Sequence, residues 1–331
     1  MTDPAVLLTR ARALEETGDF RGLVELLERL DPGPLLDEPE LRYRLAYGLR
    51  RVGRSRPALD LVVALEPSVQ RRGDDRLVRR RLSLEAMLRY DLGEVAAAEA
   101  LWERLAATSA EAGDHTLAAA ASNNLGVVRT LQDRTQEALT AYNRALLASR
   151  RLGDRRGIAQ AHQNLAILYR ELELGRESAA HFRDAHAHAR AAGSEDIMGR
   201  ADEERALLFL AEGDEPLACV SAQRALERLA AIDDATGMGE ALRVLGIAAL
   251  RRRDAERARA DLAQAHGRGV DTGNVLLQAE TLEALAVLEL LEGREAQAAS
   301  RRAEASTLFE AMGATAWGRR IRARTVQLAA L

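Results

Sequence analysis

Apolar and polar positions along the chain follow helical spacing and repeat at a fixed interval. Leu125, Val128 and Leu131 recur at every third position, and the block Asn-Leu-Gly-Val-Val at 124–128 returns as Asn-Leu-Ala-Ile-Leu at 164–168. Apolar residues three and four positions apart predict amphipathic helices, and no stretch shows the period-2 alternation of strands. The two blocks are 40 residues apart, and a period of roughly 20 to 50 residues is typical of a repeat solenoid.

The same register extends over nearly the whole chain as three columns of small or apolar residues. Each unit has one such residue in its first helix, another 12 residues later, and a third 7 residues after that. The first column is Ala11, Ala46, Ala86, Gly126, Ala166, Ala206, Gly246 and Ala286; the second is Leu23, Ala58, Ala98, Ala138, Ser178, Ala218, Ala258 and Ala298; the third is Leu30, Leu65, Leu105, Ala145, Ala185, Ala225, Ala265 and Ala305. The columns predict closely packed helix pairs in one all-α solenoid.

Glycine or aspartate marks the turn between the two helices of a unit. Glycine suits the left-handed end of a helix, and a following aspartate can cap the next helix. Asp31-Pro32-Gly33-Pro34 predicts a break after the first unit, because proline is incompatible with a helix interior. The turns lie at Gly18, Gly53, Gly93, Asp133, Gly213 and Gly293. The predicted units are 4–37, 39–72, 79–112, 119–152, 159–192, 199–232, 239–272 and 279–312, with a cap at 315–331, in a single solenoid over 1–331.

These features resemble the tetratricopeptide repeat. The resemblance rests on the small-residue columns, the Gly-Asp turns, and an aromatic residue such as Trp102, Tyr142 or Phe182 in the second helix. The period exceeds the roughly 34 residues usual for that family and overlaps the HEAT and armadillo range. The columns favour the long-repeat tetratricopeptide variety found in bacterial regulators and peptide receptors. Polar residues, His162 among them, replace the usual aromatic of the first helix.

The resemblance implies eight hairpins in a right-handed superhelix with a C-terminal capping helix, whose first helices line a concave groove. Amides suit an extended peptide because they offer donors and an acceptor, and long-repeat members place asparagine at positions such as 124 and 164 to hold the peptide backbone. Alternatively, such an asparagine bonds only to a neighbouring helix or turn. The groove positions are Tyr43, Tyr47, Arg50, Arg80, Tyr90, Asn123, Asn124, Gln163, Asn164, Arg170, Arg200, Glu203, Glu204 and Arg243.

Composition narrows the chemistry that the chain can carry. All 47 basic residues are arginine, so a P-loop lysine and a Schiff-base lysine are both excluded. Cys219 is the single cysteine, which excludes an intramolecular disulfide and fits a reducing compartment. The sequence shows neither a signal peptide nor an apolar run of about 18 residues. We therefore expect a cytoplasmic protein that does not bind a membrane.

No catalytic or metal-binding constellation stands out in the sequence. His181 and His188 share a helix face, but at metal-ligand spacing His181 has only Asp184 as a partner. Glu203 and Glu204 are adjacent and point about 100° apart on a helix, which does not suit an acid/base pair. The arginine runs lack interleaved aromatics and a DNA-reading module. We expect no metal, no cofactor and no direct contact with nucleic acid.

Charge is graded along the chain, although the net charge is only −4. Residues 41–100 contain 13 arginines against 8 acidic residues, whereas residues 201–310 contain 13 against 21. Such grading could orient a peptide with one acidic and one basic end. Alternatively, the charges only keep the outer helices solvated.

The leading interpretation is a non-catalytic scaffold that binds a peptide or protein segment in the groove. The alternative is a ligand-responsive regulator, associated with signalling or transcription, whose superhelix changes shape on binding; an enzyme ranks third. In the final helix, the four arginines at 319, 320, 322 and 324 are expected to face water. The other interpretation of this helix is a partner or homodimer contact around Trp317.

Overall fold

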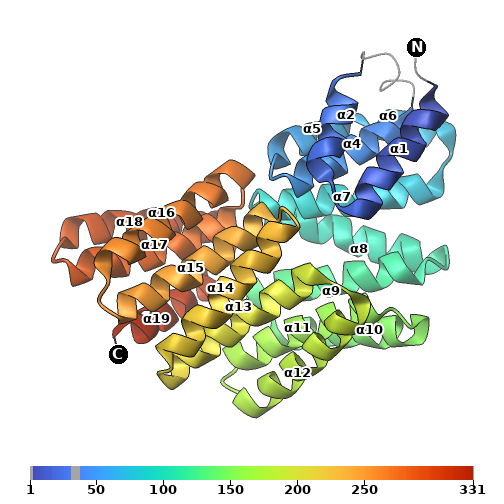
Figure 1. Cartoon of the computed structure of the whole chain (residues 1–331). Coiled ribbons are helices and arrows are strands. Elements are labelled where there is room, and N and C mark those ends of the chain that lie inside the picture. The colour runs from blue at the N-terminus through green and yellow to red at the C-terminus, as the bar shows by residue number, and fades with distance from the viewer. Residues whose placement is uncertain (1–2, 31–37, 331) are drawn as a thin grey trace.

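The chain folds entirely as helices in the residues that the computed structural model describes, 3–30 and 38–330, which confirms the predicted fold class (Figure 1). None of the helices in these ranges combines the length and the apolar character needed to cross a membrane. The helices are α1 (Pro4–Thr17), α2 (Phe20–Glu28), α4 (Pro39–Arg51), α5 (Ser55–Ala64), α6 (Glu66–Arg72), α7 (Asp75–Asp91), α8 (Val95–Glu111), α9 (His115–Leu131), α10 (Thr135–Leu152), α11 (Arg155–Glu171), α12 (Gly175–Ala192), α13 (Glu195–Glu212), α14 (Glu215–Ala231), α15 (Ala235–Arg251), α16 (Ala255–Thr272), α17 (Val275–Leu291), α18 (Glu295–Ala311) and α19 (Thr315–Ala330).

Successive helices pair as hairpins that stack in chain order (Figure 1). Within a hairpin, α9 packs on α10 and α11 packs on α12; between hairpins, α8 packs on α9 and α14 on α15. The short helix α6, which the repeat pattern does not predict, packs on α7. The result is a continuous solenoid in which every hairpin completes its core with its neighbours.

The columns of small residues are buried between helices, as predicted. All members of the first two columns are buried, and so are all members of the third except Leu30, which is half-buried. At Gly126, an added Cβ atom would lie 2.4 Å from the ring of Tyr142. Glycine therefore lets α9 approach α10 at a point where even a methyl group would require the ring to move.

The turns between hairpins are as short as those within them. Gly153 ends α10 in the left-handed conformation with φ of 67°, and Asp154 caps α11 by accepting a 3.0 Å bond from the Gly157 amide. Helix α9 begins at His115, four residues before the start of the predicted unit at 119. The extra residues of the long repeat therefore lengthen helices instead of forming loops. The predicted break at 31–34 lies outside the described residues.

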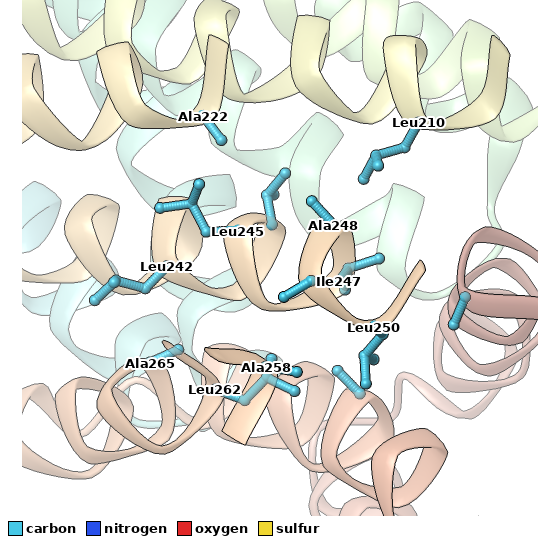
Figure 2. Close-up of a cluster of buried hydrophobic side chains, with 14 of the residues drawn as sticks. Leu210, Ala222, Leu242, Leu245, Ile247, Ala248, Leu250, Ala258, Leu262 and Ala265 are labelled. Carbon is cyan, nitrogen blue, oxygen red and sulfur yellow. The ribbon is translucent and has the colours of Figure 1, made fainter. Parts of the chain in front are cut away.

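The largest buried cluster fills the stack from α13 to α17 (Figure 2). Figure 2 shows Leu210 and Ala222 on one side of α15 and Leu262 on the other, with Leu245 and Ala248 between them. Every residue from 241 to 250 is buried. A helix enclosed on nearly all sides needs apolar residues around its whole circumference, and α15 has them.

Helix α19 covers the last hairpin. Trp317 is 7% exposed, and its indole Nε1 donates to Glu280 of α17 at 2.8 Å. Arg322 donates to both carboxylate oxygens of Glu283 at 3.0 Å. Trp317 is thus buried in the chain's own interior, so it is not an exposed contact for a second copy.

The same helix reaches back to the middle of the stack. Arg320 pairs with Asp133 and donates to the Thr130 carbonyl at 3.3 Å, while Arg324 pairs with Glu171 at the end of α11. These pairs correct the expectation that the arginines of this helix face water. Of the four arginines, only the one at position 319 is exposed. The other three form ion pairs with carboxylates on α17, on α11 and in the turn between α9 and α10.

Turns from distant hairpins also meet. A Cβ atom added at Gly53, between α4 and α5, would lie 2.7 Å from Thr272 Cγ2; one added at Gly93 would lie 3.1 Å from Val275. One added at Gly273 would lie 2.9 Å from a methyl group of Leu92. Early and late hairpins of the stack are therefore in contact, one edge against the other. We call this contact the seam: Gly53, Leu92, Gly93, Thr272, Gly273 and Val275.

Candidate ligand-binding channel

Polar positions of the first helices meet from one hairpin to the next, and we call the surface that they share the channel. The pKa of Tyr90 in α7 is raised by burial and then by nearby charges, among them Glu280 and Glu240, which belong to α17 and α15. Of the sequence-predicted residues, Tyr47, Arg50, Arg80, Tyr90, Asn124, Asn164, Arg170 and Arg200 are half-buried, whereas Tyr43, Asn123, Gln163, Glu203, Glu204 and Arg243 are buried. Their role in binding stays a prediction.

Polar contacts between successive first helices form a ladder along the channel. The partners stand close to one repeat apart, because a 40-residue period places equivalent positions of neighbouring hairpins side by side. Most of the charged groove residues therefore already have a partner inside the chain, which the sequence pattern did not reveal. The ladder consists of Arg80 to Glu40 at 3.0 Å, Arg50 to Asp91 at 2.7 Å, Asn164 to Asn123 at 3.1 Å, Arg170 to Glu204, Arg200 to Glu240 at 3.0 Å, and Arg243 to Glu280 at 3.2 Å.

The ladder has a gap between α7 and α9, where no side-chain hydrogen bond joins the two helices in the described ranges. Asn164 Nδ2 donates to Asn123 Oδ1, but Asn123 Nδ2 is buried and has no partner. Asn124 makes no side-chain hydrogen bond within the described part of the chain. An unpaired buried amide is unfavourable by about 1 to 3 kcal/mol. The amides beside this gap therefore have spare hydrogen-bonding capacity.

The acidic part of the channel is less charged at neutral pH than its residues suggest. Burial, and then the neighbouring Glu240, raise the pKa of Glu203 to about 8, while Arg243 and Arg200 oppose the shift. Burial also raises the pKa of Glu240 above its ordinary value. Glu203 therefore holds a proton at neutral pH that an exposed glutamate would have lost, and the ladder arginines offset the remaining charge.

A histidine cluster on α11 and α12 has no counterpart in the predicted site. His162 Nδ1 lies 2.8 Å from His181 Nδ1, and the rings of His162 and His188 stack with centroids 6.2 Å apart. His162 stands where the repeat usually carries an aromatic packing residue, which was the available signal. No three histidine, cysteine or acidic side chains in the described residues are placed to hold a metal ion.

A comparison with known protein families identifies which part of the chain resembles a known repeat. Residues 117–191, which span α9 to α12 almost completely, match the family model described as tetratricopeptide repeat. Residues 117–191 are similar to tetratricopeptide repeats. This confirms the predicted resemblance, and the matched segment contains both the asparagine pair and the histidine cluster. No curated protein sequence matches the chain.

Solved structures share the fold of this chain over nearly its full length. A Rap protein complexed with Competence and Sporulation Factor aligns with a TM-score of 0.63 at 16% identity, covering 99% of both chains. The Rap conjugation gene regulator of the plasmid pLS20, in complex with the Phr* peptide, aligns with a TM-score of 0.67 at 11% identity, covering 94% of this chain and 97% of that chain. At such identities the likeness establishes the fold.

Proposed function

We propose that the channel binds an extended peptide, whose main chain is held by the amides beside the ladder gap. The observation that carries this proposal is the unpaired Nδ2 of Asn123, because a peptide carbonyl would satisfy it. Asn164 gives its own donor to Asn123 and keeps its Oδ1 as an acceptor for a peptide N–H. The pair therefore offers one donor and one acceptor, which is what a peptide unit needs.

The ladder supports this proposal by holding the channel walls in place before a ligand arrives. Arg80, Arg50 and Arg200 are tied to carboxylates of neighbouring first helices. A preorganised site loses less conformational freedom on binding than a flexible one. The two similar Rap structures support it as well, since one is a complex with Competence and Sporulation Factor and the other a complex with the Phr* peptide.

We infer a binding role in place of catalysis from the partners of the perturbed carboxyls. Glu203 and Glu240 carry raised pKa values, as catalytic acids often do, but both belong to the ladder of first-helix contacts. Arginines on the next repeat engage them, so their shifts follow from packing between hairpins.

A second candidate function, that of a ligand-responsive regulator, is favoured by the seam, because a change in the curvature of the stack would alter the contacts between early and late hairpins. Such a change would give the stack a second arrangement. A ligand that binds one arrangement more tightly shifts the population toward it.

The test starts from an mRNA-displayed library of random decapeptides, selected on the immobilised full chain. A selected peptide is then titrated by calorimetry into the wild-type protein and into the double variant Asn123→Ala/Asn164→Ala. Two lost hydrogen bonds of about 0.5 to 1.5 kcal/mol each predict a Kd that rises by about 5- to 150-fold.

The matched control is Asn143→Ala on the outer face of α10, where the exposed asparagine only bonds the carbonyl of Leu139. Circular dichroism verifies that each variant is folded. Equal affinities for the wild type and the double variant would rule out the amide site, and a selection that enriches no peptide would count against the function itself.

A further inference from the structure

We propose that a row of apolar side chains along the channel selects peptides that carry an aliphatic residue at every third position. This inference rests on the proposed function, since it specifies the side chains of the peptide whose main chain the amides hold. The row, which we call the apolar row, has one residue from each of seven first helices, 40 residues apart: Tyr47, Met87, Val127, Ile167, Leu207, Ile247 and Val287.

The apolar row lies on the same helix faces as the polar ladder. Val127 follows Asn123 by four residues in α9, and in α11 Ile167 follows Asn164 by three residues and precedes Arg170 by three. Residues three and four positions apart share one face of a helix. The apolar row therefore runs beside the amides that the proposed function assigns to the peptide main chain.

The chain itself covers the C-terminal part of the apolar row. Leu207, Ile247 and Val287 are 5%, 1% and 6% exposed, and they belong to one buried cluster together with Ala329 of α19. Helix α19 packs on α15 and α17, the helices that carry the last two of these residues. This part of the row thus already binds a segment of the chain through apolar contacts.

The middle part of the apolar row is only half-buried. Met87, Val127 and Ile167 each pack at one side on a buried cluster and keep part of their surface open. Arg324 of α19 pairs with Glu171, one helical turn beyond Ile167, so the open part adjoins the surface that α19 covers. Because the two parts are continuous and alike in chemistry, the open part fits aliphatic side chains of a ligand.

The spacing of the first helices sets the spacing of those side chains. A peptide held by its main chain is extended, because a helix uses its own N–H and C=O groups internally. Third residues of an extended chain lie about 9 to 10 Å apart, and packed helices lie about 8 to 10 Å apart. Since α7, α9 and α11 are in contact in that order, one residue in three meets each successive member of the row.

Two peptide libraries test the spacing on the immobilised full chain. Both are mRNA-displayed decapeptide libraries with three fixed leucines and with polar residues at random elsewhere. The leucines stand at the second, fifth and eighth positions in the first library, and at the second, fourth and sixth positions in the second.

We expect the best peptide of the first library to bind at least about 10-fold more tightly than the best of the second. A spacing of two residues advances the chain by only about 7 Å, which leaves a leucine without an apolar partner. Calorimetry measures both Kd values. Equal affinities would overturn the proposed spacing.

A substitution in the open part of the row tests the contact itself. Val127→Ala removes two methyl groups, and the Kd of the best peptide from the first library should rise about 10-fold. The matched control is Val220→Ala on α14, where the valine is 55% exposed, and it should leave the Kd unchanged. Circular dichroism verifies that both variants are folded.

Three further peptides, each with one leucine replaced by alanine, locate the contact. One of the three should no longer respond to Val127→Ala, because the leucine that meets Val127 is then absent. An undiminished response in all three would show that Val127 acts through the fold, and the apolar row would be refuted.

The experiments separate this inference from the proposed function. Peptides that bind and respond to Asn123→Ala/Asn164→Ala, but not to leucine spacing or to Val127→Ala, would leave the amide site intact and refute the apolar row. A failure to enrich any peptide, from these libraries or from the random one, would refute the proposed function and the row with it.

Discussion

At the scale of single residues, burial controls which side chains carry charge. His162 is 2% exposed and faces Arg150 of α10 as well as His181, Asp184 and His188 of α12. Burial, and then His181, lower the pKa of His162 to about 4. One of the two facing Nδ1 atoms must therefore donate its hydrogen to the other, and a second proton would place like charges against each other and against Arg150.

This predicts that the fold loses stability in mild acid. The unfolded His162 titrates near its ordinary pKa of about 6.5, above the folded value of about 4, so the unfolded state binds more protons between these limits. Stability therefore falls as the pH drops through that window, by on the order of 2 kcal/mol at pH ~5. Urea unfolding followed by circular dichroism at pH ~7.5 and ~5 measures this loss.

The variant His162→Phe, which introduces the aromatic usual at this repeat position, should lose less stability between the two pH values than the wild type. His115→Gln, at the exposed start of α9, is the control that should keep the full dependence. If His162→Phe keeps the full dependence as well, other groups cause it.

At the scale of the elements, the hairpin is the part of the structure that the sequence predicts best. Residues equivalent to Gly126, Ala138 and Tyr142 recur in other units. The recurrence indicates which residues pack together, because each hairpin buries the same positions between its two helices. The helix ends were harder to predict. The predicted units leave residues 153–158 between them, and Gly153 and Asp154 form there the same short turn that joins helices within a hairpin.

The contact between α9 and α10 gives a stability prediction. Gly126→Ala should destabilise the protein, because overpacking by about 1 to 3 kcal/mol outweighs the gain in helix propensity of about 1 kcal/mol. Gly267→Ala in α16 is the matched control: a Cβ atom there meets nothing within 4 Å, so only the stabilising effect on the helix remains. Urea midpoints that move in the same direction for both variants would contradict this account.

At the scale of the whole molecule, the sequence predicts where polar residues stand but not what they bind. Arg80 and Arg200 are predicted to line the groove, and in the structure each is engaged by a glutamate of an adjacent repeat. The pairing depends on the lateral offset between neighbouring first helices, which no local pattern encodes. The contact between Gly53 and Thr272 escaped prediction for a related reason, because these residues meet only after several hairpins have stacked.

The contact between α19 and α17 predicts how far the destabilising effect of a substitution extends along the stack. Trp317→Phe removes the donor to buried Glu280 and should lower stability by about 1.5 to 3 kcal/mol more than Trp102→Phe, whose indole nitrogen has no partner to lose. Amide hydrogen exchange should rise in α17 and α19 and stay unchanged in α1 and α2, since repeats couple mainly to their neighbours. A uniform rise along the chain would show that the solenoid unfolds as one unit.

The seam also limits how this protein can change in size. An open solenoid can gain or lose a module by gene duplication or deletion and remain folded, because only its neighbours are affected. Here an additional hairpin between α5 and α16 would carry Thr272 past Gly53, and its removal would leave the two turns short of each other. The contact between these two turns therefore depends on the number of modules that separate them.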